Sequence, residues 1–375
     1  MKSEEANPTS APRILMHCDL DAFFAAVETL HHDLSDEIPL SIGSDPQQGR
    51  GRGIVSTCNY AARAYGIRSA MPISEAWRRC PAAPFGPGHY IRGTRSLYGR
   101  ASRKVMAILR KEADIFEQAS IDEAYMDITE RVNGDWDAAL ALAGHLQRSV
   151  LDGVNLTASF GIGPTRVIAK MSSEVNKPRG IHRVMPDEVI DFFRGRSLRE
   201  LPGIGPKRAT QLAEWGFTTA DELHAVGELT LNRLAGERFS SWFMAVVEGE
   251  SSTAVSPLRN RKSIGKEHTF DRDQRDHETV MEWLLKLVEV VMTKAVEEGV
   301  CGRLAEVKIR YTGFETHTVS RSIPVAMDDA SVFGRLASAL FANSVDAEGA
   351  IRLIGFRLGS LEMPESRQST LFEEE

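Results

Sequence analysis

Three acidic residues in two short segments have the residue types and the setting of a metal site. Asp19 ends a mostly apolar segment, and Asp122 and Glu123 stand at a turn between two other apolar segments. If the corresponding strands are neighbours, the three carboxylates meet at one edge of a sheet, where divalent cations offset their mutual repulsion. Mg²⁺ prefers such carboxylates together with substrate phosphates. Two such ions stabilise the attacking and the leaving oxygen in phosphoryl transfer, which is the chemistry that these residues indicate.

Each acid taken alone has a simpler interpretation, because single acids at strand ends are usually solvated. The combination of all three favours a metal site. Asp21 follows Asp19 by two residues, so on a strand it would share its face and lie beside the site. Glu28 and Asp127 are interpreted as structural residues.

The spacing of apolar residues predicts the elements that would position these acids. Strands are expected at residues 13–19, 115–119, 124–128 and 156–162. Helices are expected at residues 23–34, 97–109 and 136–150. This order predicts an α+β sheet with helices on one face.

The second half of the chain predicts a helical segment and then another sheet. Residues 186–250 are strand-poor and helical in character, and 251–262 have the composition of a linker that becomes basic. Strands are expected after it at 264–270, 304–311, 316–323 and 351–361, and helices at 280–295 and 330–341. These elements make a second βαββαβ unit, so a multidomain α+β protein is expected.

The composition is typical of a globular protein. Hydrophobic residues make up 42% of the 375 residues, and no run approaches the roughly 18 apolar residues of a membrane span. The polar N-terminus lacks the apolar part of a signal peptide. Cys18, Cys58, Cys80 and Cys301 form no CxxC pair, which fits a reducing cytoplasm. The net charge of −7 weighs against a nucleic-acid partner unless basic residues gather locally.

Three longer motifs resemble the Y family of DNA polymerases, in particular its DinB or polymerase IV branch. They are MHCDLDAFFAAVE at residues 16–28, STCNYAARAYGIRSAMP at 56–72 and ASIDEAYMDIT at 119–129. Three motifs in this order are far more specific than one short pattern. The resemblance covers nearly the whole chain and implies template-directed DNA synthesis of low fidelity, in translesion synthesis and DNA damage tolerance. The sequence leaves no room for a separate exonuclease domain, so proofreading is not expected.

The resemblance also implies a right-hand polymerase architecture. The implied domains are a ferredoxin-like palm at residues 12–22 and 89–184, small fingers at 23–88, a helical thumb with a helix-hairpin-helix at 185–250, a linker at 251–262, a βαββαβ little finger that binds DNA at 263–361, and a disordered tail at 362–375.

The resemblance assigns roles to individual residues near the acids. Asp19, Asp122 and Glu123, with the backbone carbonyl of Leu20, would bind two Mg²⁺ ions, for which Mn²⁺ can substitute. Phe24 matches the steric gate, whose ring leaves no room for a ribose 2′-hydroxyl.

Further residues would bind the incoming dNTP. Phe23 would lie under the sugar and base beside Phe24, although both rings could instead belong to a core. The residues that match the triphosphate-binding positions are Thr57, Tyr60, Arg63 and Lys177. Hydroxyl, phenol and guanidinium groups all donate to phosphate oxygens, whereas an exposed lysine is the alternative for Lys177.

The segment LPGIG at residues 201–205 is similar to a helix-hairpin-helix. Gly203 and Gly205 would let backbone N–H groups approach a phosphate at a helix N-terminus, and Lys207 and Arg208 add positive charge. A simple Gly/Pro connection between helices is the alternative.

The distribution of charges in the last domain can reconcile the net negative charge of the chain with binding to DNA. Lys308 and Arg310 lie two residues apart on one strand and so share a face, while acids gather at residues 271–298. We therefore expect a basic sheet face and an acidic helical back. The residues expected to bind DNA here are Arg259, Arg261, Lys262, Lys266, Lys308, Arg310 and Arg357.

The tail segment QSTLF at residues 368–372 resembles the peptide with which replication proteins dock on a sliding clamp. Gln368 would supply polar contacts, and Leu371 and Phe372 would fill an apolar pocket. A chance match is the alternative, and the pattern leaves open whether the clamp is of the bacterial or the archaeal type.

Two other functions compete with DNA synthesis. A non-catalytic polymerase relative would bind DNA or recruit partners, but such relatives typically lose the acids that this chain keeps. A nucleotidyl cyclase shares a palm-like sheet but has no use for a DNA-binding hairpin or a clamp peptide. We expect a monomeric, nucleoid-associated enzyme of the cytoplasm that has primer-template DNA, dNTP and the clamp as partners and no contact with a membrane.

Overall fold

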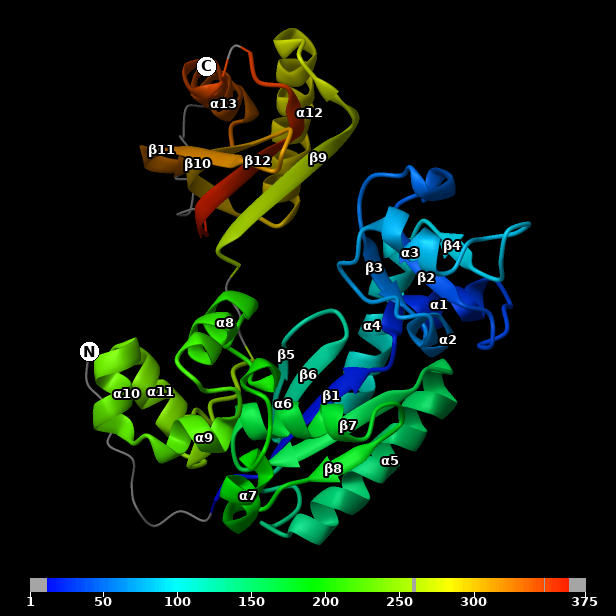
Figure 1. The fold of residues 1–375 in the computed structure, drawn as a ribbon, viewed down its shortest axis with the longest axis vertical. Coiled ribbons are helices and arrows are strands. Elements are labelled where there is room, and N and C mark those ends of the chain that lie inside the picture. Colours follow the sequence, from blue (N-terminus) through cyan, green and yellow to red (C-terminus); the bar gives the residue numbers. More distant parts are fainter. Residues whose placement is uncertain (1–11, 258–260, 347, 364–375) are drawn as a thin grey trace, which may run out of the picture. The chain divides into compact units, whose positions relative to one another are not determined.

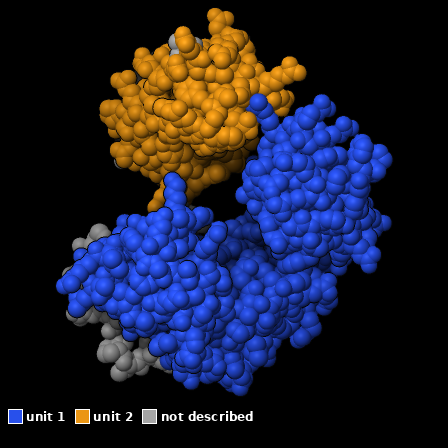
Figure 2. Space-filling model, viewed as in Figure 1, with its two compact units in different colours: residues 1–258 blue, residues 259–375 orange. Residues whose placement is uncertain are grey.

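The structure is a computed structural model that describes residues 12–257, 261–346 and 348–363. It consists of two compact units, residues 1–258 and 259–375 (Figure 2). Sheets and helices alternate in both, so the predicted α+β class is confirmed. No helix in the described ranges is long and apolar enough to cross a membrane. The four cysteines are buried.

A five-stranded sheet holds the predicted acids. Its order is β5-β6-β1-β7-β8 (Figure 1). The strands are β1 (Leu15–Leu20), β5 (Ile115–Gln118), β6 (Glu123–Asp127), β7 (Ala158–Gly163) and β8 (Ile181–Arg183). β1 is central and antiparallel to both β6 and β7, whereas β8 runs parallel to β7.

Alternation along β1 divides its side chains between the two faces of this sheet. Met16 and Cys18 point into a core shared with the helices α1 (Phe23–His31), α4 (Arg95–Arg110) and α5 (Trp136–Val154). His17 and Asp19 point to the other face, which α6 (Arg166–Val175) partly covers. The expectation of helices on one face only is therefore wrong, because α6 packs on the face of the acids.

A small sheet with the order β3-β2-β4 is inserted after α1. Its strands are β2 (Leu40–Gly43), β3 (Val55–Cys58) and β4 (His89–Ile91). A short helix, α2 (Tyr60–Ala64), follows β3, and α3 (Ile73–Arg79) and the 3-10 turn η1 (Gln47–Gly49) complete the subdomain.

Residues 186–250 form a cluster of short helices, as expected. They are η2 (Pro186–Glu188), α7 (Val189–Phe193), η3 (Leu198–Glu200), α8 (Pro206–Glu214), α9 (Ala220–Ala225), α10 (Glu228–Ala235) and α11 (Glu237–Val247). Phe193, Leu212 and Phe243 are fully buried at its centre. The segment that follows docks on the sheet, since Ser256 N donates to Glu117 at 2.9 Å.

The second unit has the predicted βαββαβ order, with strands longer than expected. Its elements are β9 (Ser263–Gln274), α12 (His277–Glu297), β10 (Cys301–Tyr311), β11 (Thr316–Met327), α13 (Ala330–Ser344) and β12 (Ile351–Glu362). The sheet order is β11-β10-β12-β9, and all neighbours are antiparallel. Val307 and Ile309 are buried in the core with the helices, so Lys308 and Arg310 lie on the open face.

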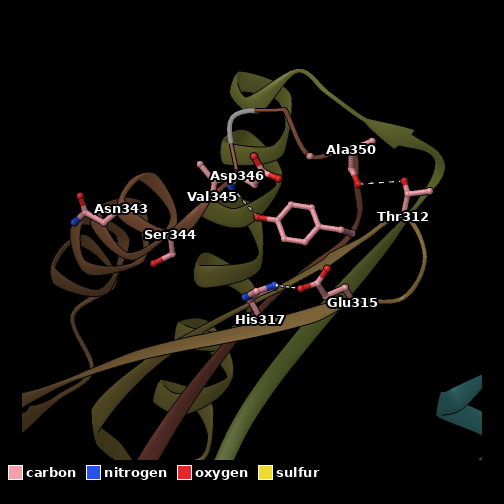
Figure 3. A pocket seen from close by; sticks show the side chains of 10 residues that line it. Thr312, Glu315, His317, Asn343, Ser344, Val345, Asp346 and Ala350 are labelled. Carbon is pink, nitrogen blue, oxygen red and sulfur yellow. Dashed lines mark hydrogen bonds and ion pairs between the residues drawn. The ribbon is translucent and has the colours of Figure 1, made fainter.

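A polar cavity of about 510 Å³ lies beside the turn between β10 and β11 (Figure 3). The Tyr311 hydroxyl accepts a hydrogen bond from Asp346 N at 2.8 Å, and His317 Nε2 lies 2.9 Å from Glu315 Oε1. His317 pairs in register with the buried Ile309. The cavity therefore belongs to the helical side of the sheet and not to its open face.

Candidate active site

The antiparallel pairing of β1 with β6 brings the three predicted acids together. Asp19 stands in register with Glu123, and Leu20 N donates to the carbonyl of Asp122 at 3.1 Å. Asp19 and Glu123, which are far apart in the chain, thus meet at one end of two central strands. The Leu20 carbonyl lies at the same strand end.

Asp19 is a buried carboxylate that is paired with Lys177. It is 9% exposed, and its Oδ1 lies 2.7 Å from Lys177 Nζ. Burial raises the pKa of Asp19 to about 7, against the opposing effect of Lys177. Such a carboxylate needs a cation beside it to remain ionised, and here the cation is a lysine.

The other two acids are fixed by a serine and a second lysine. The Ser120 hydroxyl donates to Asp122 Oδ1 at 2.5 Å and accepts from Glu123 N at 3.0 Å. Glu123 forms an ion pair with Lys170 of α6. Ser120 therefore shapes the turn, and Lys170 covers the charge of the third acid.

The donor set fits a hard cation, although the acids hold lysines in this structure. Within the described residues, no three His, Cys, Asp or Glu side chains are gathered closely enough to hold a metal ion as they stand. Three carboxylates and one backbone carbonyl are nevertheless the oxygen ligands that Mg²⁺ prefers. A cation at Asp19 would also offset the desolvation that raises the pKa of this acid.

A buried histidine, His17, lies on the same face of β1 as Asp19. His17 is fully buried, and its Nδ1 lies 2.9 Å from the Ser173 hydroxyl of α6. Burial, and then the charge of Lys170, lower the pKa of His17 well below its usual value. The ring is therefore neutral and serves as packing between β1, α6 and Tyr125, whose ring centroid is 4.6 Å away.

The two phenylalanines after β1 have different surroundings. Phe23 is buried in the sheet core, which fits the alternative that the sequence left open for it. Phe24 is only partly buried and stacks on Tyr98, with ring centroids 4.2 Å apart and planes inclined by 12°. The Tyr98 hydroxyl donates to the buried Glu28 at 2.5 Å. Glu28 is therefore a structural residue, as expected, and it fixes the ring on which Phe24 rests.

The predicted triphosphate residues lie at the start of α2. Asn59 caps this helix by accepting from Ala62 N at 2.9 Å. Tyr60 and Arg63 are one turn apart, and the guanidinium lies 4.4 Å from the phenol ring centroid. The Tyr60 hydroxyl is buried without a hydrogen-bond partner in the described chain. Thr57 precedes them on β3, in register with Ile42.

Asp21 ties the loop of Lys177 to the sheet. Its Oδ2 accepts from Arg179 N at 3.0 Å, and its Oδ1 accepts from the Ser159 hydroxyl at 2.8 Å. Asp21 is 3% exposed. Asp21 thus lies beside the acids, as expected, and holds the loop that carries Lys177.

The segment at residues 201–205 has a positive φ at Gly203 and leads through Gly205 into the N-terminus of α8. Gly203 has a φ of 109°, and a Cβ there would lie 2.8 Å from Trp242. Gly205 precedes α8, whose first residue is Pro206. Lys207 is exposed, and the Arg208 guanidinium lies 4.7 Å from the ring centroid of Phe239.

The open face of the second sheet is not purely basic, and this part of the expectation is wrong. Glu267 and Glu306 share the face with Lys308 and Arg357, because the alternation along β9 and β10 places them there. Lys308 Nζ lies 2.8 Å from Glu267, and Arg357 Nε lies 2.7 Å from Glu306. Arg310 donates to Thr316 at 2.9 Å.

The other predicted DNA contacts of this unit are dispersed. Lys266 is exposed but stands in register with the buried Phe356, on the helical side. Arg261 pairs with Glu298 at 2.5 Å, and Lys262 is exposed just before β9. Arg259 lies outside the described residues, as do Gln368, Leu371 and Phe372 of the clamp peptide.

Sequence reasoning missed the residues of α6 that contact Glu123 and His17. Lys170 and Ser173 belong to a helix for which no expectation was made, and neither carries a motif. His17 could have been found, since it alternates with Asp19 along one strand.

Comparisons with known proteins agree along nearly the full chain. Residues 18–174 match the impB/mucB/samB family, and residues 261–371 match the C-terminal domain of that family. A DNA polymerase IV of Methanoculleus marisnigri is 37% identical over 97% of this chain and 99% of its own length. A DNA polymerase IV of Streptococcus pneumoniae is 36% identical over 92% of this chain and 96% of its own.

Solved structures of similar proteins have the same fold. A Y-family DNA polymerase chimera, Dbh-Dpo4(243-245)-Dbh, has a TM-score of 0.83 at 26% identity, covering 94% of this chain and 100% of its own. An insertion ternary complex of Dbh DNA polymerase has a TM-score of 0.65 at 25% identity, with the same coverage. DinB from Sulfolobus solfataricus has a TM-score of 0.63 at 25% identity, again with the same coverage.

Proposed function

The chain belongs to the Y family of translesion DNA polymerases, in the DNA polymerase IV (DinB) branch, and on that premise we propose that its nucleotidyl transfer takes place where Asp19, Asp122 and Glu123 meet. The nucleotidyl cyclase considered from the sequence is thereby excluded. The observation that carries the proposal is the register of β1 and β6, which sets Asp19 opposite Glu123. The oxygens of these acids are the ligands that divalent cations require.

Two Mg²⁺ ions, for which Mn²⁺ can substitute, would be held by the three acids and the Leu20 carbonyl, and when bound they would activate the primer 3′-hydroxyl and neutralise the triphosphate. The chain's own part is to hold Asp19 in a buried position, where it is paired with Lys177. Ser120 orients Asp122 through a hydrogen bond of 2.5 Å.

The phosphates of the dNTP would be bound from two sides. Tyr60 and Arg63 supply a hydroxyl and a guanidinium from α2, and Thr57 supplies a second hydroxyl from β3. Lys177 now pairs with Asp19 and Glu174. Because its side chain is only partly buried, Lys177 can exchange an acid for a phosphate when the nucleotide enters.

Phe24 would act as the gate against ribonucleotides. Its ring is held by stacking on Tyr98, which is itself held by Glu28. A ring fixed in this way cannot move aside for a 2′-hydroxyl. The absence of proofreading, which the sequence led us to expect, is part of the same proposal.

The remaining parts of the proposal concern the domains and partners. The five-stranded sheet would be the palm, with the fingers at 23–88, the thumb at 185–250 and the little finger at 263–361. Primer-template DNA would contact the α8 segment and the open face of the second sheet, and residues 368–372 would bind a sliding clamp. A monomer associated with the nucleoid in the cytoplasm fits this substrate.

Primer extension tests the assignment of the acids. The full chain, given a primed template, dNTPs and Mg²⁺, should extend the primer. The Asp122→Ala/Glu123→Ala variant should lose about 10³-fold or more of the rate, because several kcal/mol of charge stabilisation are removed, while binding of the primed template persists. Near-normal extension by the variant would place the chemistry elsewhere.

A further inference from the structure

The loop that carries Lys177 is short and tightly folded. It spans residues 176–180 and joins α6 to β8. A Cβ added at Gly180 would lie 2.1 Å from the Asn176 carbonyl oxygen, so the loop folds back closely on itself. Lys177 Nζ lies 2.7 Å from Asp19 Oδ1. The place of this ammonium group beside the acid therefore depends on the backbone of the loop.

The backbone of Arg179, within this loop, is held in an unusual conformation. Its φ is 59°, in the left-handed region that residues with a side chain rarely adopt. Such a conformation persists where the surrounding structure fixes it. Here the Arg179 N–H donates to Asp21 Oδ2 at 3.0 Å, and the Arg179 carbonyl accepts from Gln147 Nε2 at 2.9 Å. Side chains of two other elements thus hold both backbone groups of this residue.

Gln147 reaches the loop from a helix outside the site. It lies on α5, which packs against β7 and β8 (Figure 1). The carboxamide NH₂ has two donor positions, and it also donates to the carbonyl of Ala158 at 3.0 Å. Ala158 begins β7 and stands in register with Leu20. One side chain therefore fastens the loop of Lys177 to the strand residue opposite Leu20.

The second anchor of the loop is part of the site itself. Asp21 Oδ1 accepts from the Ser159 hydroxyl at 2.8 Å, and the same hydroxyl oxygen accepts from Gly180 N at 3.3 Å. Asp21 directly follows Leu20, a proposed metal ligand, so a substitution of Asp21 would disturb the metal site as well. Gln147 can be changed without touching the acids.

The loop and α2 line the same space. A cavity of about 710 Å³ has Pro178 and Arg179 of the loop among its lining, together with Asn59 and Tyr60 at the start of α2. α2 carries proposed phosphate ligands, as does the loop. A shift of the loop therefore changes the distance between the two groups of ligands that the triphosphate would bridge.

We propose that Gln147 is a positioning residue for the incoming dNTP and that it acts through Lys177. Its carboxamide fixes the Arg179 carbonyl and so keeps the loop in the conformation that presents Lys177 beside Asp19. A phosphate ligand that is in place before the nucleotide arrives lowers the ordering cost of binding. This inference deepens the proposed function and rests on it, because it takes Lys177 as a ligand of the triphosphate.

Single-nucleotide insertion by the full chain on a primed template tests the proposal. Gln147→Met keeps an unbranched side chain of similar helix preference and removes both donors. It should raise KM for dNTP about fivefold, the order expected for one lost hydrogen bond. It should leave kcat within about twofold, as expected when an interaction shared by ground state and transition state is lost. The control is His145→Met, an exposed position on the same helix, which should change neither constant.

A double-mutant cycle with Lys177→Ala shows whether Gln147 acts through this lysine. Lys177→Ala alone should raise KM for dNTP. Adding Gln147→Met to it should cause no further rise, because the group that the loop places is already gone. Thermal unfolding of each variant is recorded in parallel. A purely structural role would lower the unfolding midpoint of Gln147→Met and leave KM of the folded enzyme at its native value.

Two results would overturn the proposal, and a third would overturn its premise. A native KM in Gln147→Met, beside a raised KM in Lys177→Ala, means that the loop places Lys177 without Gln147. Effects of the two substitutions that multiply in the double variant mean that Gln147 acts by another route. A native KM in Lys177→Ala removes this lysine from the triphosphate site, so a failure of the proposed function is seen separately.

Discussion

At the scale of single residues, the site is a set of buried acids whose charges are covered by lysines. Lys177 lies 2.7 Å from Asp19, and Lys170 pairs with Glu123. Both lysines come from α6 or the loop after it, so the same segment that covers the acids also carries the proposed phosphate ligand. The Lys177 ammonium opposes the rise in the pKa of Asp19 that burial causes.

The gate residue gives a prediction at this scale. Phe24→Ala should raise the use of ribonucleotides relative to dNTPs by about 10²-fold, because the ring that excludes a 2′-hydroxyl is gone. Single-nucleotide insertion with matched dNTP and NTP measures it. Phe23→Leu, which changes a buried core ring, is the control and should leave the sugar preference intact. Unchanged sugar discrimination in Phe24→Ala would remove the gate assignment.

The acids themselves could be predicted from the sequence, whereas their lysine partners could not. Asp19 lies near the end of one apolar strand and Glu123 begins another. This local pattern can be recognised in the sequence alone. Lys170 meets Glu123 only because α6 crosses the sheet, and a lysine on an amphipathic helix carries no mark of its partner. The same holds for Glu267 and Glu306, whose strand faces follow from register and not from composition.

At the scale of elements, the active site depends on how closely α6 approaches β7. Gly161 makes that approach possible, since a Cβ there would lie 2.0 Å from the Ala169 carbonyl oxygen and 2.2 Å from Ser173 N. This close packing places Lys170 within reach of Glu123 and Ser173 within hydrogen-bond distance of His17. The long helices and strands were predictable from their periodicity, but this contact is not visible in any one of them.

Gly161→Ala should therefore destabilise the protein by about 2–3 kcal/mol, because the backbone of α6 must move. Gly144→Ala in α5 is the matched control. The nearest atom to its added Cβ is 3.6 Å away, and alanine should stabilise that helix by about 0.5–1 kcal/mol. Urea denaturation measures both. Similar midpoints for the two variants would contradict the account of this packing.

At the scale of the whole molecule, the chain separates its charges although its net charge is −7. The outer side of α4 is basic, and the second unit pairs most of its open-face cations with acids. The sequence predicted the two sheets and the helical segment between them. It overestimated how basic the second sheet is, because a count of residues does not say which acids share a face with the cations.

The tail provides a prediction at this scale. Deletion of residues 364–375 should leave extension by single binding events unchanged and should abolish stimulation by a sliding clamp, because Leu371 and Phe372 are the proposed anchors. Extension with and without a loaded clamp measures both activities, and Leu371→Ala/Phe372→Ala is the conservative companion. If the clamp still stimulates the shortened chain, the anchor lies elsewhere.

The most direct test of the central claim is calorimetric titration of Mn²⁺ into the full chain bound to dNTP and a primer-template with a dideoxy end. The native chain should bind two ions. Asp19→Asn should lose at least one or weaken binding by about tenfold or more, whereas Asp152→Asn, an exposed acid on α5, should bind as the native chain does. Native stoichiometry and affinity in Asp19→Asn would contradict the assignment of these carboxylates as the metal site.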